Sequence, residues 1–328
     1  MTGGALRLAG CLVLLATSPL AASPLHLEKA ARYSDKAGGR ILLIWERGQL
    51  FKHENGGITA PTPVDVMSIT KSIVAMQWLS RFSPDEPVAI ASGLRARDLL
   101  SQTSGLSAGD ERLYRRNLRN VRREVLLIRR QSPSGSVFVY GPAHYELLGA
   151  ELSIRLGDRK NPPLELLKRL GIQTSEWRSD REGNAFASAG ARLSGNDLLK
   201  IGRLLLDGGS AGPFLKILPR GRLTSALKGT RANPAYGLGF WLNVNAAAPG
   251  AQESDVELAI KSGAGTDFWK RMALSSAAPP DLFCMAGSFG QRVYIVPSRR
   301  LVIVRLGSGR KFRDPEFLRT LFAGKPPA

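Results

Sequence analysis

A serine and a lysine stand three residues apart at the predicted start of a helix, in residues 67–76. Apolar residues recur through this segment at helical spacing, at Ile69, Ile73 and Met76. The spacing predicts one buried helix face, and Asp65 is placed to cap the helix N-terminus. Because residues three apart share a helix face, we expect the Ser68 hydroxyl and the Lys71 amine to meet.

A serine hydroxyl is a weak nucleophile until a base takes its proton. Lysine can be that base only when its ammonium form is destabilised. Burial beside the apolar stripe and the positive end of the helix dipole both act in that direction. The pair therefore predicts a nucleophile, Ser68, activated by Lys71. The alternative is a chance match, because this spacing occurs in most proteins of this size, so the rest of the chain must decide.

The elements that must position this pair are segregated along the chain. Strands are predicted at residues 40–46, 49–53, 236–244, 282–286, 291–296 and 301–306, followed by a closing helix from Lys311. Helical patterns dominate from Ser68 to about Leu206. Strands at both ends with helices between them predict an α+β fold. In it, residues 23–66 and 230–328 form an antiparallel sheet flanked by helices, and residues 67–229 form an inserted all-helical region.

Several separated stretches follow Ser68-Ile69-Thr70-Lys71 in a fixed order. They are residues 97–106, Tyr140-Gly141-Pro142, Tyr236-Gly237-Leu238-Gly239, Gly287-Ser288-Phe289-Gly290, and the strands at 294–297 and 301–305. Together they resemble the serine beta-lactamase-related superfamily, which includes class C beta-lactamases, penicillin-binding proteins and similar esterases and amidases. The resemblance covers nearly the whole chain after residue 22 and implies a beta-lactamase/transpeptidase-like fold.

The resemblance also implies roles for individual residues. Ser68 would be the acylated nucleophile, and Lys71 would take its proton and pass it with Tyr140 to the leaving group. The backbone N–H groups of Ser68 and Ser288 would form the oxyanion hole. The nearby lysine is expected to hold Tyr140 partly as phenolate. No metal or other cofactor is implied, since the three histidines are scattered and no cysteine pair exists.

Two departures from the family pattern bear on the substrate. Pro142 stands where the lactamase members carry the asparagine of a Tyr-x-Asn triplet, so that amide is missing. The triplet that corresponds to Lys-Thr-Gly is Met285-Ala286-Gly287, without a basic side chain. Recognition of a substrate carboxylate by this strand is therefore not expected. Ala286 and Gly287 are expected to line the substrate cleft together with His144, which lies four residues after Tyr140.

Three other features have simpler explanations. Lys261-Ser262-Gly263 resembles the third motif but lies too far before the strand at 294–297. Residues 105–109 spell a nucleophile elbow, but a helix precedes them and His144 is the last histidine in the chain. Cys284 lies in an apolar run and is expected to be a buried packing residue.

The N-terminus reads as an export signal over residues 1–22. Arg7 supplies the positive charge, residues 8–16 the apolar core, and residues 20–22 a cleavage site before Ser23. An exported, periplasmic or secreted protein is expected. Modification of Cys11 as a lipoprotein is the less favoured alternative, because most of the apolar run follows that cysteine.

The formal net charge is +19, which favours anionic neighbours such as a membrane surface or a cell-wall polymer. The densest basic segment, residues 112–130, is predicted to be a helix with a solvated basic face. Nucleic-acid binding is not favoured, because only Tyr114 could stack on a base there. The sequence does not indicate an oligomeric state.

The sequence predicts an exported serine hydrolase that acts through a Ser68 acyl-enzyme on a small ester or amide. One alternative keeps the chemistry but assigns a D-alanyl peptide or a beta-lactam as substrate. The other is a binding protein that retains the cleft without turnover, which the altered triplets motivate.

Overall fold

The computed structural model describes residues 23–157, 164–173, 176–212 and 216–325. The predicted export signal, Arg7 and Cys11 included, lies outside these residues. The centre of the fold is a six-stranded sheet with the order β2-β1-β10-β9-β8-β5. Its strands are β1 (Gly39–Glu46), β2 (Gln49–Glu54), β5 (Trp241–Leu242), β8 (Phe283–Gly287), β9 (Gln291–Val296) and β10 (Leu301–Gly307). All their pairings are antiparallel.

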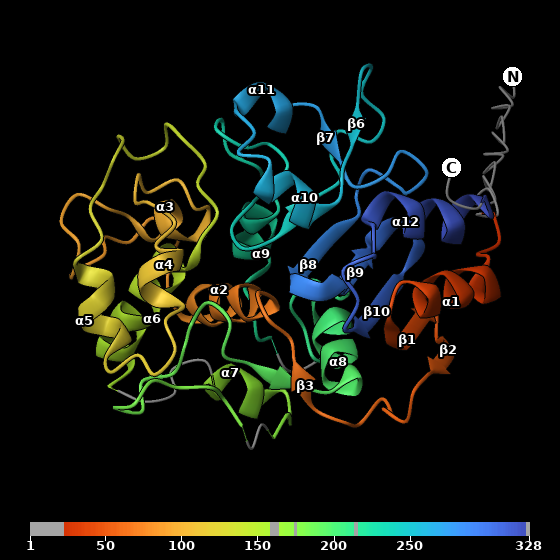
Figure 1. Ribbon diagram of the computed structural model, residues 1–328, viewed down its shortest axis with the longest axis horizontal. Coiled ribbons are helices and arrows are strands. Elements are labelled where there is room, and N and C mark those ends of the chain that lie inside the picture. Colours follow the sequence, from red (N-terminus) through yellow and green to blue (C-terminus); the bar gives the residue numbers. More distant parts are fainter. Residues whose placement is uncertain (1–22, 158–163, 174–175, 213–215, 326–328) are drawn as a thin grey trace, which may run out of the picture.

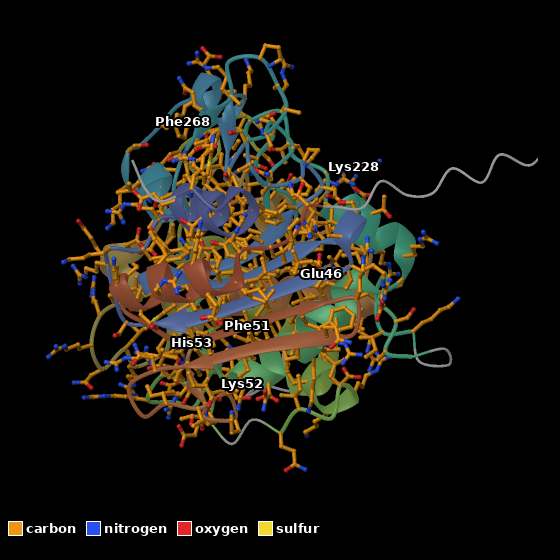
Figure 2. All side chains as sticks on the ribbon, turned by 90° about the vertical axis from the view of Figure 1, so that its right-hand side faces the viewer. Glu46, Phe51, Lys52, His53, Lys228 and Phe268 are labelled. Carbon is orange, nitrogen blue, oxygen red and sulfur yellow. The ribbon has the colours of Figure 1, made fainter. Side chains whose placement is uncertain are left out.

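Both chain ends build this sheet, as the sequence predicts. The first hairpin, β1 and β2, joins the last one through β1 and β10, with Ile44 opposite Ile303. Figure 2 views the molecule from the side of β2, where Phe51, Lys52 and His53 lie along the outermost strand. A charged lysine on an edge strand discourages pairing with other chains.

Alternating side chains divide the sheet into two apolar faces. Val302 and Val304 belong to the cluster that contains α8 (Gly195–Leu206). Leu301 and Ile303 belong to the cluster that contains α1 (Leu27–Lys36) and α12 (Asp314–Ala323). Figure 1 shows α1 and α12 together on one side of the sheet.

The helical region comes between the two sheet-forming segments in the sequence and lies beside the sheet in space (Figure 1). Its helices are α2 (Ile69–Arg81), α3 (Ala96–Leu100), α4 (Asp110–Leu113), α5 (Val121–Leu126), α6 (Pro142–Leu156), α7 (Leu164–Arg169) and α9 (Arg220–Ala226). Smaller elements complete the described chain: β3 (Val64–Asp65) with β4 (Arg192–Leu193), β6 (Gln252–Glu253) with β7 (Met272–Ala273), α10 (Val256–Lys261), α11 (Thr266–Trp269), and 3-10 turns at Ser288–Gly290 and Pro297–Arg299.

Three local expectations need correction, and one helix was missed. Asp65 does not cap α2, because it lies in β3 opposite Arg192, and Ser68 itself is the N-cap residue. Residues 112–130 do not form one helix: α4 and α5 are separated by a loop in which Asn117 has φ 58°. Of residues 236–244, only Trp241–Leu242 is a strand. The helix α1, which begins at Leu27, was not predicted.

Cys284 is fully buried in β8, in agreement with the packing role predicted for it. Within the described ranges, no helix combines the length and the apolar character that crossing a bilayer requires.

Candidate active site

Ser68 lies at the point where the chain turns into α2. Met67 has φ 53°, in the left-handed region that a methionine rarely adopts. The Thr70 hydroxyl donates a hydrogen bond of 2.6 Å to the Met67 carbonyl oxygen and accepts one from the backbone N–H of Ala191. These bonds hold the turn so that the Ser68 side chain remains partly exposed while α2 behind it is buried.

Lys71 meets Ser68 as the three-residue spacing predicts. Its Nζ donates to Ser68 Oγ at 3.1 Å and to the carbonyl oxygen of Ser188 at 3.0 Å. The side chain is buried, and burial lowers the pKa of Lys71 to about 8, although the negative charges of Glu146 and Asp110 act in the opposite direction. A substantial neutral fraction near pH 8 makes this amine a competent general base.

Glu146 and Ser188 position that amine, and sequence reasoning missed both. The Glu146 carboxylate on α6 accepts from Ala187 N at 3.0 Å, Ser188 N at 2.9 Å and Ser188 Oγ at 2.6 Å. It thereby fixes the Ser188 carbonyl that accepts a hydrogen bond from Lys71. The sequence signal for them is limited to an acidic residue in a largely buried helix, where a carboxylate needs partners.

Tyr140 is brought to the same place from just before α6. The Lys71 Nζ lies 5.1 Å from the centroid of its ring. Burial raises the pKa of Tyr140 to about 12, although the nearby Ser68 hydroxyl and the positive charge of Arg292 lower it in part. The expectation of a phenolate is therefore wrong, because desolvation outweighs the neighbouring cations.

Gln102 clamps the backbone on both sides of Tyr140. Its carbonyl oxygen accepts from Val139 N at 3.0 Å, and its Oε1 accepts from Gly141 N at 2.9 Å. Its amide nitrogen donates to the Tyr236 hydroxyl at 3.0 Å. Gln102 therefore connects three of the stretches on which the resemblance rests.

The end of β8 lies directly against the backbone of Ser68. A Cβ on Gly287 would be 2.3 Å from the Val66 carbonyl oxygen and 3.2 Å from Ser68 N. Only glycine allows this approach. Ser288 follows at the mouth of the same cavity that Ser68 lines. The backbone N–H groups of these two serines are thus on adjacent segments, as the proposed oxyanion hole requires.

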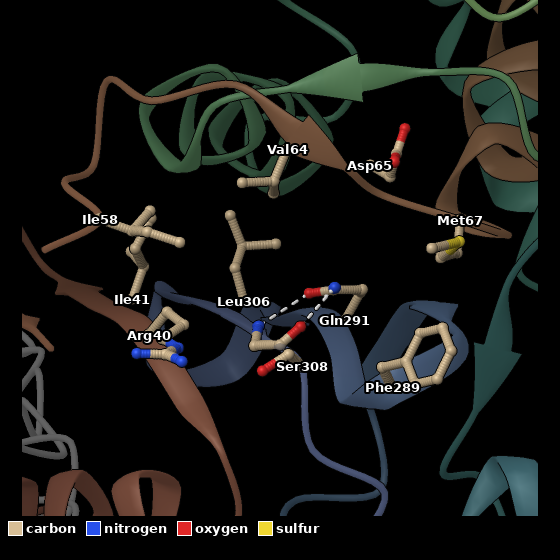
Figure 3. A pocket seen from close by; sticks show the side chains of 11 residues that line it. Arg40, Ile41, Ile58, Val64, Asp65, Met67, Phe289, Gln291, Leu306 and Ser308 are labelled. Carbon is tan, nitrogen blue, oxygen red and sulfur yellow. Dashed lines mark hydrogen bonds between the residues drawn. The ribbon is translucent and has the colours of Figure 1, made fainter. Parts of the chain in front are cut away.

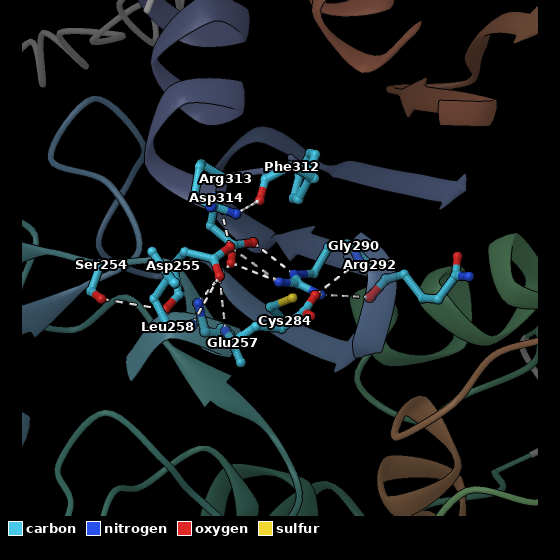
Figure 4. Close-up of polar contacts among 12 residues, drawn as sticks. Ser254, Asp255, Glu257, Leu258, Cys284, Gly290, Arg292, Phe312, Arg313 and Asp314 are labelled. Atoms are coloured by element: carbon cyan, nitrogen blue, oxygen red, sulfur yellow. Dashed lines mark hydrogen bonds and ion pairs between the residues drawn. The ribbon is translucent and has the colours of Figure 1, made fainter. Parts of the chain in front are cut away.

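A buried charge network supports this turn from behind (Figure 4). Arg292 Nη1 donates to the Gly287 carbonyl oxygen at 2.7 Å, and Glu257 Oε1 accepts from Gly290 N at 2.9 Å. The Arg292 guanidinium also makes two bonds to Asp314, at 2.8 and 2.9 Å. Arg292 holds the pKa of Asp314 below its usual value. A desolvated charge that is paired in this way fixes the segment from Gly287 to Gly290.

The cavity that opens on Ser68 has a volume of about 760 Å³. Its walls come from the start of α2, the turn after β8 and two loops of the helical region. The lining residues used below are Ser68, Ser288, Phe289, Arg115, Arg116, Arg178, Asp180 and Arg181. A second cavity of about 420 Å³ shares Met67 and Phe289 with it. Figure 3 shows this neighbour, whose apolar wall includes Ile58 and Leu306.

The remaining predicted site residues do not line the Ser68 cavity. His144 is fully buried, with its Nδ1 2.9 Å from Ser104 Oγ and its Nε2 without a hydrogen-bond partner in the described part of the chain. Burial lowers the pKa of His144 to about 4. Its assignment to the cleft was therefore wrong. Gly287 is also buried and faces the backbone around Ser68 rather than the open cavity, and Ala286 is buried in the apolar cluster that contains α1 and α12. Lys261 is the last residue of α10, so Lys261-Ser262-Gly263 is not part of a strand.

A family model described as Beta-lactamase matches residues 26–323. The structure is similar to those of EstCE1, "a hydrolase with promiscuous acyltransferase activity" (14% identity, TM-score 0.64, covering 89% of this chain and 95% of that one), and of an octameric penicillin-binding protein homologue from Pyrococcus abyssi (18%, 0.62, 92% and 76%). A beta-lactamase from Mycobacterium bovis is a third neighbour (16%, 0.60, 89% and 96%). A comparison with curated proteins finds no match. The chain belongs to the Beta-lactamase family, whose members are serine hydrolases built on a beta-lactamase/transpeptidase-like fold.

Proposed function

We propose that this protein is an exported serine hydrolase that cleaves an ester or amide through an acyl-enzyme on Ser68. The observation that carries the proposal is the 3.1 Å contact between Lys71 Nζ and Ser68 Oγ, made by an amine whose pKa is lowered to about 8. A nucleophile and a base in hydrogen-bonding reach, with the base oriented by a third group, is the arrangement that nucleophilic catalysis needs. Here the third group is the Ser188 carbonyl.

In the acylation step, neutral Lys71 takes the proton of Ser68 as its Oγ attacks the substrate carbonyl carbon. The backbone N–H groups of Ser68 and Ser288 stabilise the negative charge that develops on the carbonyl oxygen. Collapse of this intermediate breaks the bond to the leaving group, which receives the proton held by Lys71, either directly or through the Tyr140 hydroxyl, so that Lys71 is neutral again. Water then attacks the acyl group, with Lys71 again as base, and releases Ser68.

The strand beside the serine favours an ester or amide over a beta-lactam. Its triplet Met285-Ala286-Gly287 offers no cation to a ring carboxylate, and Pro142 offers no amide. A D-alanyl peptide is disfavoured for the same reason. The retained contact of Lys71 with Ser68 counts against a protein that only binds.

A fluorophosphonate probe tests the chemistry directly. Mass spectrometry should find the probe on Ser68, and Ser68→Ala should abolish labelling. Hydrolysis of p-nitrophenyl butyrate should be lost in both Ser68→Ala and Lys71→Ala, whereas fluorescent penicillin should acylate the wild type poorly. Equal labelling or turnover in Ser68→Ala would refute the proposal.

Export is a separate part of the proposal and rests on residues 1–22 alone. Expression of the full chain in a Gram-negative host should give a periplasmic protein whose N-terminal residue is Ser23. Retention of Met1 in a cytoplasmic fraction would contradict it.

A further inference from the structure

The cavity that opens on Ser68 carries an unusual concentration of positive charge. Four of its lining residues are arginines: Arg115, Arg116, Arg178 and Arg181. All four side chains are exposed, and none forms an ion pair within the described ranges of the chain. Unpaired like charges gathered at one opening repel one another, so the arrangement costs stability unless a ligand compensates for it.

The acidic lining residue does not neutralise these arginines. Each oxygen of Asp180 is already used: Oδ1 accepts from the backbone N–H groups of Glu182 and Asn184, and Oδ2 from Val121 N and the Asn184 amide. Four donors satisfy this carboxylate. Apart from Arg115 Nε, which donates to the Glu111 carbonyl oxygen at 3.2 Å, the guanidinium groups around it therefore keep their donors available to the cavity.

The two arginine-bearing loops are tied to each other by the backbone. Arg181 N donates to the Leu118 carbonyl oxygen at 3.0 Å, and Glu182 N donates to that of Arg119 at 3.2 Å. The bond from Val121 N to Asp180, at 2.7 Å, is a third connection. Residues 115–116 and 178–181 are thus held as one wall, so their charges act together on whatever enters the cavity.

The sheet side of the cavity is different, because Ser288 is followed by Phe289 and the neighbouring strand ends without a basic residue. We infer that the substrate of the proposed hydrolase carries an anionic group, a carboxylate or phosphate, remote from the bond that is cleaved, and that the wall formed by residues 115–116 and 178–181 binds this group. The inference rests on the proposed Ser68 chemistry. Guanidinium groups suit both anions through paired hydrogen bonds.

The test compares esters that differ in one charge. The neutral reference is p-nitrophenyl butyrate. The p-nitrophenyl monoester of glutaric acid carries a carboxylate on the acyl side. The butyrate esters of 3-hydroxybenzoic acid and of 3-hydroxyphenyl phosphate, whose neutral counterpart is phenyl butyrate, carry an anion on the leaving-group side. In the wild type, kcat/KM for at least one anionic ester should exceed that for its neutral counterpart, and added salt should reduce the excess.

The double variants Arg115→Gln/Arg116→Gln and Arg178→Gln/Arg181→Gln should each lower the ratio of anionic to neutral kcat/KM roughly tenfold, the effect of about one charge-assisted hydrogen bond. The control is Arg47→Gln/Arg271→Gln, which removes the same charge from exposed residues outside the cavity and should leave the ratio unchanged. Circular dichroism establishes folding, and the matching lysine variants should recover part of the ratio.

The outcomes separate the two proposals. A ratio that is unchanged in both arginine variants, or that falls equally in the control, overturns the anionic substrate while leaving Ser68 chemistry intact. Absence of Ser68-dependent hydrolysis of every ester overturns the proposed function, and the inference with it. The ester that shows the effect identifies the side of the scissile bond on which the anion lies.

Discussion

Replacing Lys71 by methionine should stabilise the protein while it abolishes activity. Lys71 is 1% exposed, and burial lowers the pKa of its amine from 10.5 to about 8. One pKa unit corresponds to about 1.4 kcal/mol, so keeping the proton on the buried amine costs roughly 3 kcal/mol. Methionine is of similar length and carries no charge. Removing that cost should stabilise the variant, but loss of the hydrogen bond to the Ser188 carbonyl should offset about 1 kcal/mol of the stabilisation.

The stability gained by the methionine variant should decrease as the pH rises. Below pH 8 the lysine is protonated in both the folded and the unfolded chain, so the full cost is present and the variant is the more stable protein by roughly 2 kcal/mol. Between pH 8 and 10.5 only the unfolded chain still holds the proton, and the cost declines as the pH rises. Above pH 10.5 the advantage of methionine is gone.

Urea unfolding of the wild type and Lys71→Met at pH 7 and pH 10 measures this difference. Lys228→Met is the matched control, since Lys228 is exposed (Figure 2) and its change should be small at both pH values. A difference between wild type and Lys71→Met that does not decrease from pH 7 to pH 10 would show that the pKa of Lys71 is not lowered by burial. The acylation rate should fall about 10²- to 10⁴-fold, the usual contribution of a general base.

One pH profile and two further variants probe the same site. The kcat/KM of the wild type should rise with pH around an apparent pKa of about 8, because Lys71 accepts a proton only when neutral; a profile that is flat from pH 6 to 9 would exclude it as the base. Glu146→Gln removes a charge that raises the pKa of Lys71, so the midpoint of that profile should move below 8. The free energy of unfolding should also fall by roughly 1–3 kcal/mol, because a single amide oxygen replaces a carboxylate that accepts three hydrogen bonds. Gly287→Ala places a Cβ 2.3 Å from a backbone carbonyl oxygen beside Ser68 and should abolish probe labelling, whereas Gly221→Ala, whose Cβ meets nothing within 4 Å, should retain it.

The sheet could be predicted because its signals are local. Three strands of the two hairpins, β1, β9 and β10, are short apolar runs, and β2 follows β1 after a two-residue turn. β1 and β10 must pair to bury both of their faces. The prediction of one helix over residues 112–130 was wrong because its signal did not define a single local element. Leu113, Val121 and Val125 are buried as a helical stripe would require, but from two short helices around a turn at Asn117. Spacing alone does not distinguish these arrangements.

The catalytic pair was accessible from sequence because three residues separate its members on one helix. Tyr140 came from the resemblance, since the distance of 72 positions between it and Ser68 carries no geometric information. His144 was misplaced because the four-residue spacing applies only within a helix. α6 begins at Pro142, after Tyr140, so the two side chains do not share a face. Gln102 and Glu146 act through contacts that are distant in sequence, which spacing cannot reveal.

Burial acts in opposite senses on the two titratable groups beside Ser68, and this divides their roles. Both are placed where water is largely excluded, so each favours its neutral form. For Lys71 that form is a base, which accepts the serine proton, and its pKa falls to about 8. For Tyr140 it is a phenol, whose pKa rises to about 12, so it donates a hydrogen bond and does not act as a base near pH 8. One environment thus supplies a proton acceptor and a proton donor on either side of the nucleophile, which is what transfer of the serine proton to a departing oxygen or nitrogen requires.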